Sequence, residues 1–434
     1  MRNIQVIKNA GWIIICKIIQ SIIQLIIGMM CARYLGPSNY GLINYASSVV
    51  AFALPVMKLG FDATLVGELI KEPDKEGEIM GTSLGMNLGA SVICMAAVAL
   101  FVSVVNAKET SVIIVCILYS ISLICTALEM IQYWFQYKLL SKYSSIVMLV
   151  VYIVVSIYRI TISALSKSIY WFAVTNVLDY GLIGITLLAL YFKKGTQPLS
   201  FSVKRAKALF SRSKYYIFAS LMVKVVQNTD HIMLTTFLSE AENGIYSAAI
   251  TSISVLEFVY TGIIDSFRPL ILQAKKINEK KYKSFMALLY GIICYLMFAQ
   301  NIAFVIGADF IIRILYGTAY LDAVPVLRIL TFFHVFSVMG SVRNVWILAE
   351  QKQKYLPVIN LLAAGSNVGL NAFFIPHWGA CGAAFASLLT QVFANFILGF
   401  LIEPMRENNR LLLRGLRPEF LITQIRIFLS ENRS

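Results

Sequence analysis

Two apolar stretches of the sequence each carry one lysine together with amide and hydroxyl side chains at helical spacing. In the first, Lys17, Gln20, Ser21 and Gln24 follow the spacing i, i+3, i+4, i+7 and share one helix face. The second stretch carries a similar stripe: Ser220, Lys224, Gln227, Asn228 and His231. Lys and Arg side chains suit phosphate oxygens. We therefore expect a polar, cationic lumen, with these candidate binding residues: Lys17, Gln20, Gln24, Arg159, Lys224, Gln227 and Asn228.

Ionisable side chains inside apolar stretches have more than one interpretation. On insertion scales each costs about 2.5–3.5 kcal/mol in a bilayer, so such groups face a cavity or a partner. Asp179, Asp230 and Glu257 could bind a proton or a sodium ion that drives transport, or each could form a structural ion pair. Lys17 could also extend to the cytoplasmic surface, because it lies only about two turns inside its stretch.

The cysteines and histidines do not form a metal-binding pattern. The seven cysteines are scattered, and His334 and His377 have no metal-ligating partner at helical spacing. We therefore expect no metal site and no cofactor, and any energy source would be a proton or sodium gradient.

The elements that carry these residues are expected to be transmembrane helices. Apolar residues make up 59% of the 434 positions, charged residues only 14%, and the mean hydropathy is +0.75. About 20 apolar residues cross a bilayer as a helix. This window predicts an all-α integral membrane protein with about 12 spans, roughly 10–32, 40–58, 81–104, 111–131, 144–164, 169–192, 215–238, 244–270, 284–305, 324–348, 355–375 and 380–402.

The basic residues predict the orientation of these spans. If both termini are cytoplasmic, most of the 37 Lys and Arg residues lie on the cytoplasmic side, as expected from the positive-inside rule. The opposite side then holds only Arg33, Lys108, Lys167 and Arg313. This distribution also explains the net charge of +15, so nucleic acid is not an expected partner.

The two halves of the chain resemble each other. A shift of 203 residues aligns Gln24 with Gln227 (227 − 24) and Gly41 with Gly244. We therefore predict two pseudo-symmetric six-helix lobes, residues 1–192 and 215–402, joined by a basic cytoplasmic linker at 193–214 and followed by a cytoplasmic tail at 403–434. Such a two-lobed arrangement suits alternating access around a site between the lobes.

Several short motifs occur in a characteristic order along the chain. Ala32-Arg33-Tyr34-Leu35-Gly36-Pro37 is followed by Tyr40-Gly41, and Tyr133-Trp134-Phe135-Gln136 follows the fourth expected span. Later segments are Asp230 with Ile232-Met233-Leu234, Gly244 with Tyr246, Leu315-Tyr316-Gly317, and Ile375-Pro376 with Gly379 and Gly382-Ala383-Ala384. In this order the motifs resemble those of bacterial polysaccharide (O-antigen type) flippases of the multidrug/oligosaccharidyl-lipid/polysaccharide exporter superfamily.

The resemblance implies a MATE-like, multi-pass protein of the bacterial cytoplasmic (inner) membrane that is not an enzyme. It implies translocation of an undecaprenyl-pyrophosphate-linked oligosaccharide for O-antigen, capsule or exopolysaccharide synthesis, driven by a cation gradient. Its expected partners are that substrate and membrane lipids, and a polysaccharide polymerase and a chain-length regulator are candidate protein partners. Lys17 and Lys224, with Arg159 farther out, would bind the pyrophosphate, while Asp179 or Asp230 would couple the cation.

Three other functions are compatible with a polytopic chain. A multidrug exporter of the same superfamily would need an acid-dominated cavity for cationic drugs, whereas the polar stripes here are basic. A membrane polysaccharide polymerase generally uses a large outside loop, and the longest expected one runs only from about Gly307 to Ala323. The third alternative, an accessory subunit, would not require buried charges at repeat-related positions.

Overall fold

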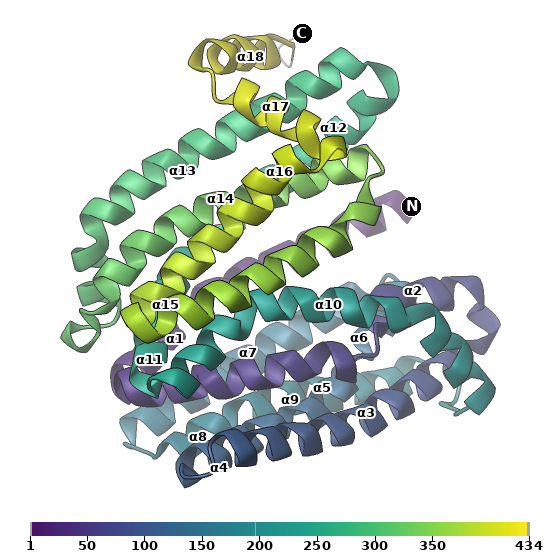
Figure 1. The fold of residues 1–434 in the computed structure, drawn as a ribbon. Coiled ribbons are helices and arrows are strands. Elements are labelled where there is room, and N and C mark those ends of the chain that lie inside the picture. Colours follow the sequence, from purple (N-terminus) through teal and green to yellow (C-terminus); the bar gives the residue numbers. More distant parts are fainter. Residues whose placement is uncertain (1, 196, 432–434) are drawn as a thin grey trace. The chain divides into compact units, whose positions relative to one another are not determined.

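The computed structural model describes residues 2–195 and 197–431 (Figure 1). Within these ranges the chain forms helices joined by short turns and no strand, which confirms the predicted all-α class. Contacts divide the chain into two compact units, Met1–Gly244 and Ile245–Ser434. We call them unit 1 and unit 2 and describe each by itself.

Unit 1 contains the helices that carry most of the predicted site residues. They are α1 (Arg2–Met57), α2 (Phe61–Lys71), α3 (Glu76–Val105), α4 (Thr110–Ser120), α5 (Ser122–Glu129), α6 (Gln132–Tyr137), α7 (Ser141–Ala164), α8 (Ile169–Ala173), α9 (Thr175–Lys194), α10 (Val203–Phe237) and the first part of α11 (Glu240–Ser254). A single 3₁₀ turn, Pro73–Lys75, precedes α3. The apolar core lies where α1, α3, α4 and α5 pack together, around Tyr45, Val102 and Leu123.

Unit 2 contains the rest of α11 and the helices that follow it. They are α12 (Glu257–Ile277), α13 (Glu279–Leu315), α14 (Ala323–Ala349), α15 (Leu356–Val392), α16 (Leu398–Leu401), α17 (Arg406–Gly415) and α18 (Pro418–Glu431). Short turns lie at Thr318–Tyr320, Gln353–Tyr355 and Glu403–Met405, and a π-helical stretch at Phe393–Ile397 joins α15 to α16. Its core is formed by α12, α13 and α14, with Tyr290 and Trp346 among the fully buried side chains.

Two glycines interrupt long helices at positions between predicted spans. In α1 the helix breaks at Gly36, with φ 70° and ψ 172°, and Pro37 follows. In α15 the break is at Gly379, with φ 56° and ψ −136°, shortly after Pro376. Glycine adopts positive φ without the penalty that a Cβ imposes. Each break therefore separates two of the predicted spans within one continuous helical stretch.

The number of membrane spans is only partly determined by helix length and composition. Eight helical stretches in the described chain are long and apolar enough to cross a membrane, or nine if the bent pair α11–α12 counts as one span. Two of the eight, Ile18–Lys71 and Gln353–Leu401, contain the breaks at Gly36 and Gly379. The protein is thus a multi-pass membrane protein, while the total of twelve spans and the side of the termini remain predictions.

The expected linker at 193–214 is partly helical. Helix α10 begins at Val203 and continues without a break through the seventh predicted span to Phe237, packing against α1 and α3. For this reason α10 belongs to unit 1, and the division between units follows Gly244 instead of the linker. The side-chain hydroxyl of Ser202 caps the helix by accepting a hydrogen bond from the Arg205 backbone N–H at 3.3 Å.

The predicted cytoplasmic tail at 403–434 also contains helices within its described part. The Tyr290 hydroxyl of α13 donates to Asn408 Oδ1 of α17 at 2.8 Å. A Cβ added at Gly415 would lie 2.2 Å from the Ala287 carbonyl oxygen, so the two helices touch through backbone. Helix α17 is therefore packed into unit 2.

Ion pairs join the start of α10 to the segment between α1 and α3. Arg205 binds Glu72 through two guanidinium nitrogens at 2.7 and 2.8 Å, and Arg212 pairs with Glu68. Glu76, itself almost fully buried, pairs with Lys138 at 2.6 Å. The sequence predicted a basic linker here, and at least Arg205 and Arg212 are neutralised within the protein.

The Arg205–Glu72 pair predicts a pH dependence of folding stability. The Arg205 guanidinium lowers the pKa of the Glu72 carboxyl from 4.5 to about 2. The folded state then binds fewer protons than the unfolded state, so the pair stabilises fully above pH 4.5 and loses this contribution as the pH falls toward 2. We expect Glu72→Gln to lower the melting temperature of the purified protein at pH 7, with a difference from wild type that shrinks between pH 4.5 and pH 3.

A matched control is Asp74→Asn, which removes an exposed carboxylate two residues away. Asp74→Asn should leave the melting temperature close to that of wild type at pH 7 and at pH 3. A Glu72→Gln deficit that stays constant from pH 7 to pH 3 would contradict the assigned role of the ion pair.

Candidate functional site

The polar stripe predicted on α10 is present. Lys224 Nζ donates to Gln227 Oε1 at 3.1 Å, and Asn228 Nδ2 donates to the Lys224 backbone carbonyl at 3.0 Å. Gln227 thus holds the Lys224 ammonium on the face that the spacing predicts. The Lys58 ammonium, at the end of α1, lies within electrostatic range of Lys224. Unit 1 therefore places two cations, from α1 and α10, near each other.

The matching stripe on α1 is only partly within the described structure. Gln20 is half-buried and Gln24 is exposed. The Lys17 side chain lies outside the described residues, so its proposed pairing with Lys224 remains a prediction. Lys58, which the sequence analysis did not select, lies within electrostatic range of Lys224.

His231 and its neighbours hold the corner between α10 and α11 against α1. His231 Nδ1 lies 2.7 Å from Asn243 Oδ1, and Asn243 Nδ2 donates to the Gly41 carbonyl at 2.8 Å. The helices approach so closely that a Cβ at Gly41 would lie 1.7 Å from the Glu240 carbonyl oxygen, and one at Gly244 would lie 1.9 Å from that of Pro37. His231 thus takes part in a packing contact, and the repeat-related glycines permit the crossing.

Two residues to which the sequence gave separate roles come together between α7 and α9. Arg159 and Asp179 lie within electrostatic range of each other. The Arg159 guanidinium also lies 5.9 Å from the centroid of the Tyr152 ring. Asp179 Oδ1 is buried and has no hydrogen-bond partner among the described atoms. A buried carboxylate oxygen of this kind is costly unless it gains a proton, a cation or water.

The remaining acids differ in their surroundings. Asp230 is 3% exposed in α10 of unit 1. Glu257, in contrast, is exposed as the first residue of α12 in unit 2. Of the three candidates for cation coupling, Asp179 is the one that combines burial with an unpartnered oxygen.

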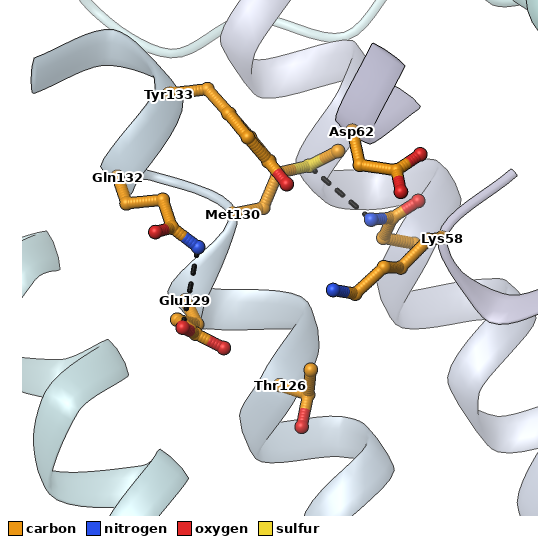
Figure 2. A pocket seen from close by; sticks show the side chains of 8 residues that line it. Lys58, Asp62, Thr126, Glu129, Met130, Gln132 and Tyr133 are labelled. Carbon is orange, nitrogen blue, oxygen red and sulfur yellow. Dashed lines mark hydrogen bonds between the residues drawn. The ribbon is translucent and has the colours of Figure 1, made fainter. Parts of the chain in front are cut away.

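A small polar pocket at the end of α1 contains residues that the sequence analysis did not select (Figure 2). Its cavity volume is only about 10 Å³, about what one water molecule needs, so a larger ligand requires the lining side chains to move apart. Its lining comes from the turn after α1 and from the region of α2, α3, α5 and α6, and comprises Lys58, Asp62, Asn87, Thr126, Glu129, Met130, Gln132 and Tyr133. We call it the Lys58 pocket.

Local backbone geometry builds the Lys58 pocket. Helix α1 ends at Met57, and Leu59 and Gly60 adopt positive φ of 53° and 72°, so the chain turns sharply into α2 just after Lys58. Figure 2 shows the Lys58 side chain extending toward the segment that carries Thr126 and Glu129. The Glu129 Oε1 atom accepts a hydrogen bond from Gln132 Nε2 at 3.2 Å.

The pocket connects electrostatically to the Arg159–Asp179 pair. Glu129 lies within electrostatic range of both Lys58 and Asp179. Unit 1 thus contains a row of interacting charges, which runs from Lys58 through Glu129 and Asp179 to Arg159. Such a row can bind an anion at either cationic end and can hold a proton or a cation at its two carboxylates.

The sequence gives only a weak indication that Lys58, Glu129 and Tyr133 line a pocket. Lys58 and Glu129 lie at the ends of predicted spans, where a charged side chain can reach the surface and needs no site. Tyr133 belongs to a motif that carried the family resemblance, but that motif alone does not place it beside Lys58. Among the described residues, no group of three or more His, Cys, Asp or Glu side chains could hold a metal ion.

The fold is that of transporters of the MOP superfamily. An inward-facing multidrug resistance MATE transporter of this superfamily superposes with a TM-score of 0.69 at 14% identity, covering 89% of this chain and 94% of that one. The lipid II flippase MurJ, in its inward closed conformation, superposes with a TM-score of 0.70 at 15% identity, covering 96% of this chain and 92% of that one. At these identities the likeness concerns the fold alone.

Sequence comparison identifies the family. The model of the polysaccharide biosynthesis protein family matches residues 6–275, more than half of the chain. The teichuronic acid biosynthesis protein TuaB of Bacillus subtilis (strain 168) is 23% identical over 357 residues, covering 80% of this chain and 71% of TuaB. This chain belongs to the polysaccharide biosynthesis protein family, a family of multi-pass membrane proteins of the cytoplasmic membrane, and the resemblance seen in its motifs is confirmed.

Proposed function

We propose that this protein is a flippase that moves an undecaprenyl-pyrophosphate-linked oligosaccharide from the cytoplasmic to the outer leaflet. The observation that carries the proposal is the pair of cations, Lys58 and Lys224, held near each other within a largely apolar bundle. Two ammonium groups at this position would repel each other unless an anion lies between them. A pyrophosphate supplies that charge, and its phosphate oxygens suit the lysines.

The polar side chains around Lys58 suit the sugar next to the pyrophosphate. Asn87, Gln132 and Tyr133 supply amide and phenol groups, and Asp62 and Glu129 supply acceptors for sugar hydroxyls. The family match, and relatives named for teichuronic acid biosynthesis and for lipid II flipping, support a lipid-linked glycan as the substrate class. A polysaccharide polymerase and a chain-length regulator would then act on the translocated product.

For coupling, we propose that Asp179 binds the driving cation. Its buried, unpartnered Oδ1 can accept a proton or take part in sodium binding, and Arg159 favours the ionised carboxylate when the cation leaves. Glu129 would transmit this change in charge to Lys58, because it lies within electrostatic range of both Asp179 and Lys58. Cation release and phosphate binding would thus be linked through adjacent charges.

The second candidate function is export of cationic drugs. The carboxylates of Asp62 and Glu129 in the Lys58 pocket favour it, as does the MATE fold. In the same region, however, Lys58 and Lys224 oppose a cationic ligand. A drug exporter would change the sensitivity of its host to cationic compounds and leave lipid-linked precursors unaffected.

The phosphate role predicts the phenotype of a double variant. In a deletion strain, Lys58→Ala with Lys224→Ala should reduce surface polysaccharide by at least about tenfold, because one lost hydrogen bond to a charged group is worth about 1.5–3 kcal/mol. Lys58→Arg with Lys224→Arg keeps the charge and should retain much of the function. Surface polysaccharide and membrane levels of the protein would be measured together.

The matched control removes two exposed lysines from the start of α10, Lys204→Ala with Lys207→Ala. It should keep surface polysaccharide near the wild-type level. Full function of the Lys58/Lys224 double alanine variant, at normal protein levels, would exclude the proposed phosphate role.

The coupling role predicts a loss of gradient dependence. In proteoliposomes, Asp179→Asn should translocate substrate slowly and at the same rate with or without a proton or sodium gradient, because the amide neither gains nor loses charge. Asp230→Asn is the comparison variant and should remain gradient-dependent. A wild-type response to the gradient in Asp179→Asn would assign the coupling to another residue.

A further inference from the structure

An apolar groove lies along α1 and α3 of unit 1, with α10 at its side. Every residue that lines it is apolar: Val49, Phe52, Ala53 and Val56 from α1, Cys94, Ala97, Val98 and Phe101 from α3, and Ile232 from α10. The groove has a volume of about 470 Å³. None of the roles proposed above uses it.

The groove and the Lys58 pocket follow the same two helices. On α1, Val56 of the groove lies two residues before Lys58. On α3, Asn87 of the pocket and Cys94 of the groove are seven residues apart, which places them on one helix face about 10 Å from each other along the axis. The apolar groove therefore leads along this pair of helices to the polar pocket.

The pocket end of this path has unused polar groups. Asn87 is 2% exposed, its Nδ2 donates to the Met130 sulfur at 3.3 Å, and its Oδ1 has no partner among the described atoms. Lys58 forms no ion pair within the described part of the chain. A buried amide oxygen and an ammonium that both lack a partner are costly as long as no ligand binds them. Together they indicate a ligand with an anionic group and hydroxyl donors.

We propose that the groove holds the polyisoprenyl chain of the lipid-linked substrate while its pyrophosphate lies at Lys58. This inference rests on the proposed function and adds a binding site for the tail. A single groove that leads to one mixed polar pocket fits a one-chain lipid with a phosphate and a sugar. A glycerophospholipid, by contrast, carries two acyl chains and a small head group.

The groove also assigns a role to its small residues. Ala53 and Ala97 keep the space open from opposite helices, and Ala97 is exposed toward it. A ring at position 97 would occupy the space that the tail needs. The adjacent Ala96 is also exposed but does not line the groove, so the two alanines form a matched pair for substitution.

Binding of two probes to the purified full-length protein tests the proposal. The probes are undecaprenyl pyrophosphate and geranyl pyrophosphate, which carry the same head group on a long and a much shorter isoprenoid chain. Wild type should bind the long chain more tightly.

Ala97→Phe should weaken binding of the long probe by about tenfold, the effect of roughly two buried methylene groups, and leave binding of the short probe unchanged. Val56→Phe should act likewise from the other helix, and Ala96→Phe should resemble wild type.

Each other outcome overturns the proposal in a distinct way. If Ala97→Phe and Val56→Phe bind the long probe as wild type does, the tail lies elsewhere, although the flippase function stands. If dioleoyl phosphatidylglycerol vesicles displace the long probe as well as unlabelled undecaprenyl pyrophosphate does, the groove is a site for bilayer lipid. If wild type binds neither probe, the proposed function fails together with the inference.

Discussion

The cost of charge within an apolar bundle is the constraint on which this structure depends. Several charges of unit 1 are paired within the protein, as Arg205 is with Glu72 and Arg212 with Glu68. Paired charges of this kind fix the start of α10 against the segment before α3. Within the apolar bundle itself, charges without a close partner are the ones available for ligands.

The site that results is a row of charges and not a single cationic centre. Lys58 and Arg159 lie at its ends, and Glu129 and Asp179 lie between them. Anion binding at Lys58 and cation binding at Asp179 would therefore affect each other through space, with no need for a distant conformational signal. This arrangement offers a physical basis for coupling in which substrate and cation share one network within unit 1.

The sequence predicted the helices and their turns better than it predicted the site. Hydropathy marks apolar helices directly, and Gly36 and Gly379 break helices between predicted spans. The stripe around Lys224 also follows from helical spacing, whereas the contact of His231 with Asn243 does not. Lys58 and Glu129 were missed because their proximity depends on how α1, α5 and α6 pack, which periodicity does not reveal. The pairing of Arg205 and Arg212 was missed for the same reason.

The most direct test of the account is to delete the gene, extract the lipid-linked precursors and determine the membrane leaflet on which they lie. The account predicts that single repeat units accumulate on the cytoplasmic leaflet, that surface polysaccharide is lost, and that the wild-type gene restores both. Precursors that reach the outer leaflet in the deletion strain would contradict it, whether they remain unpolymerised there or are displayed normally.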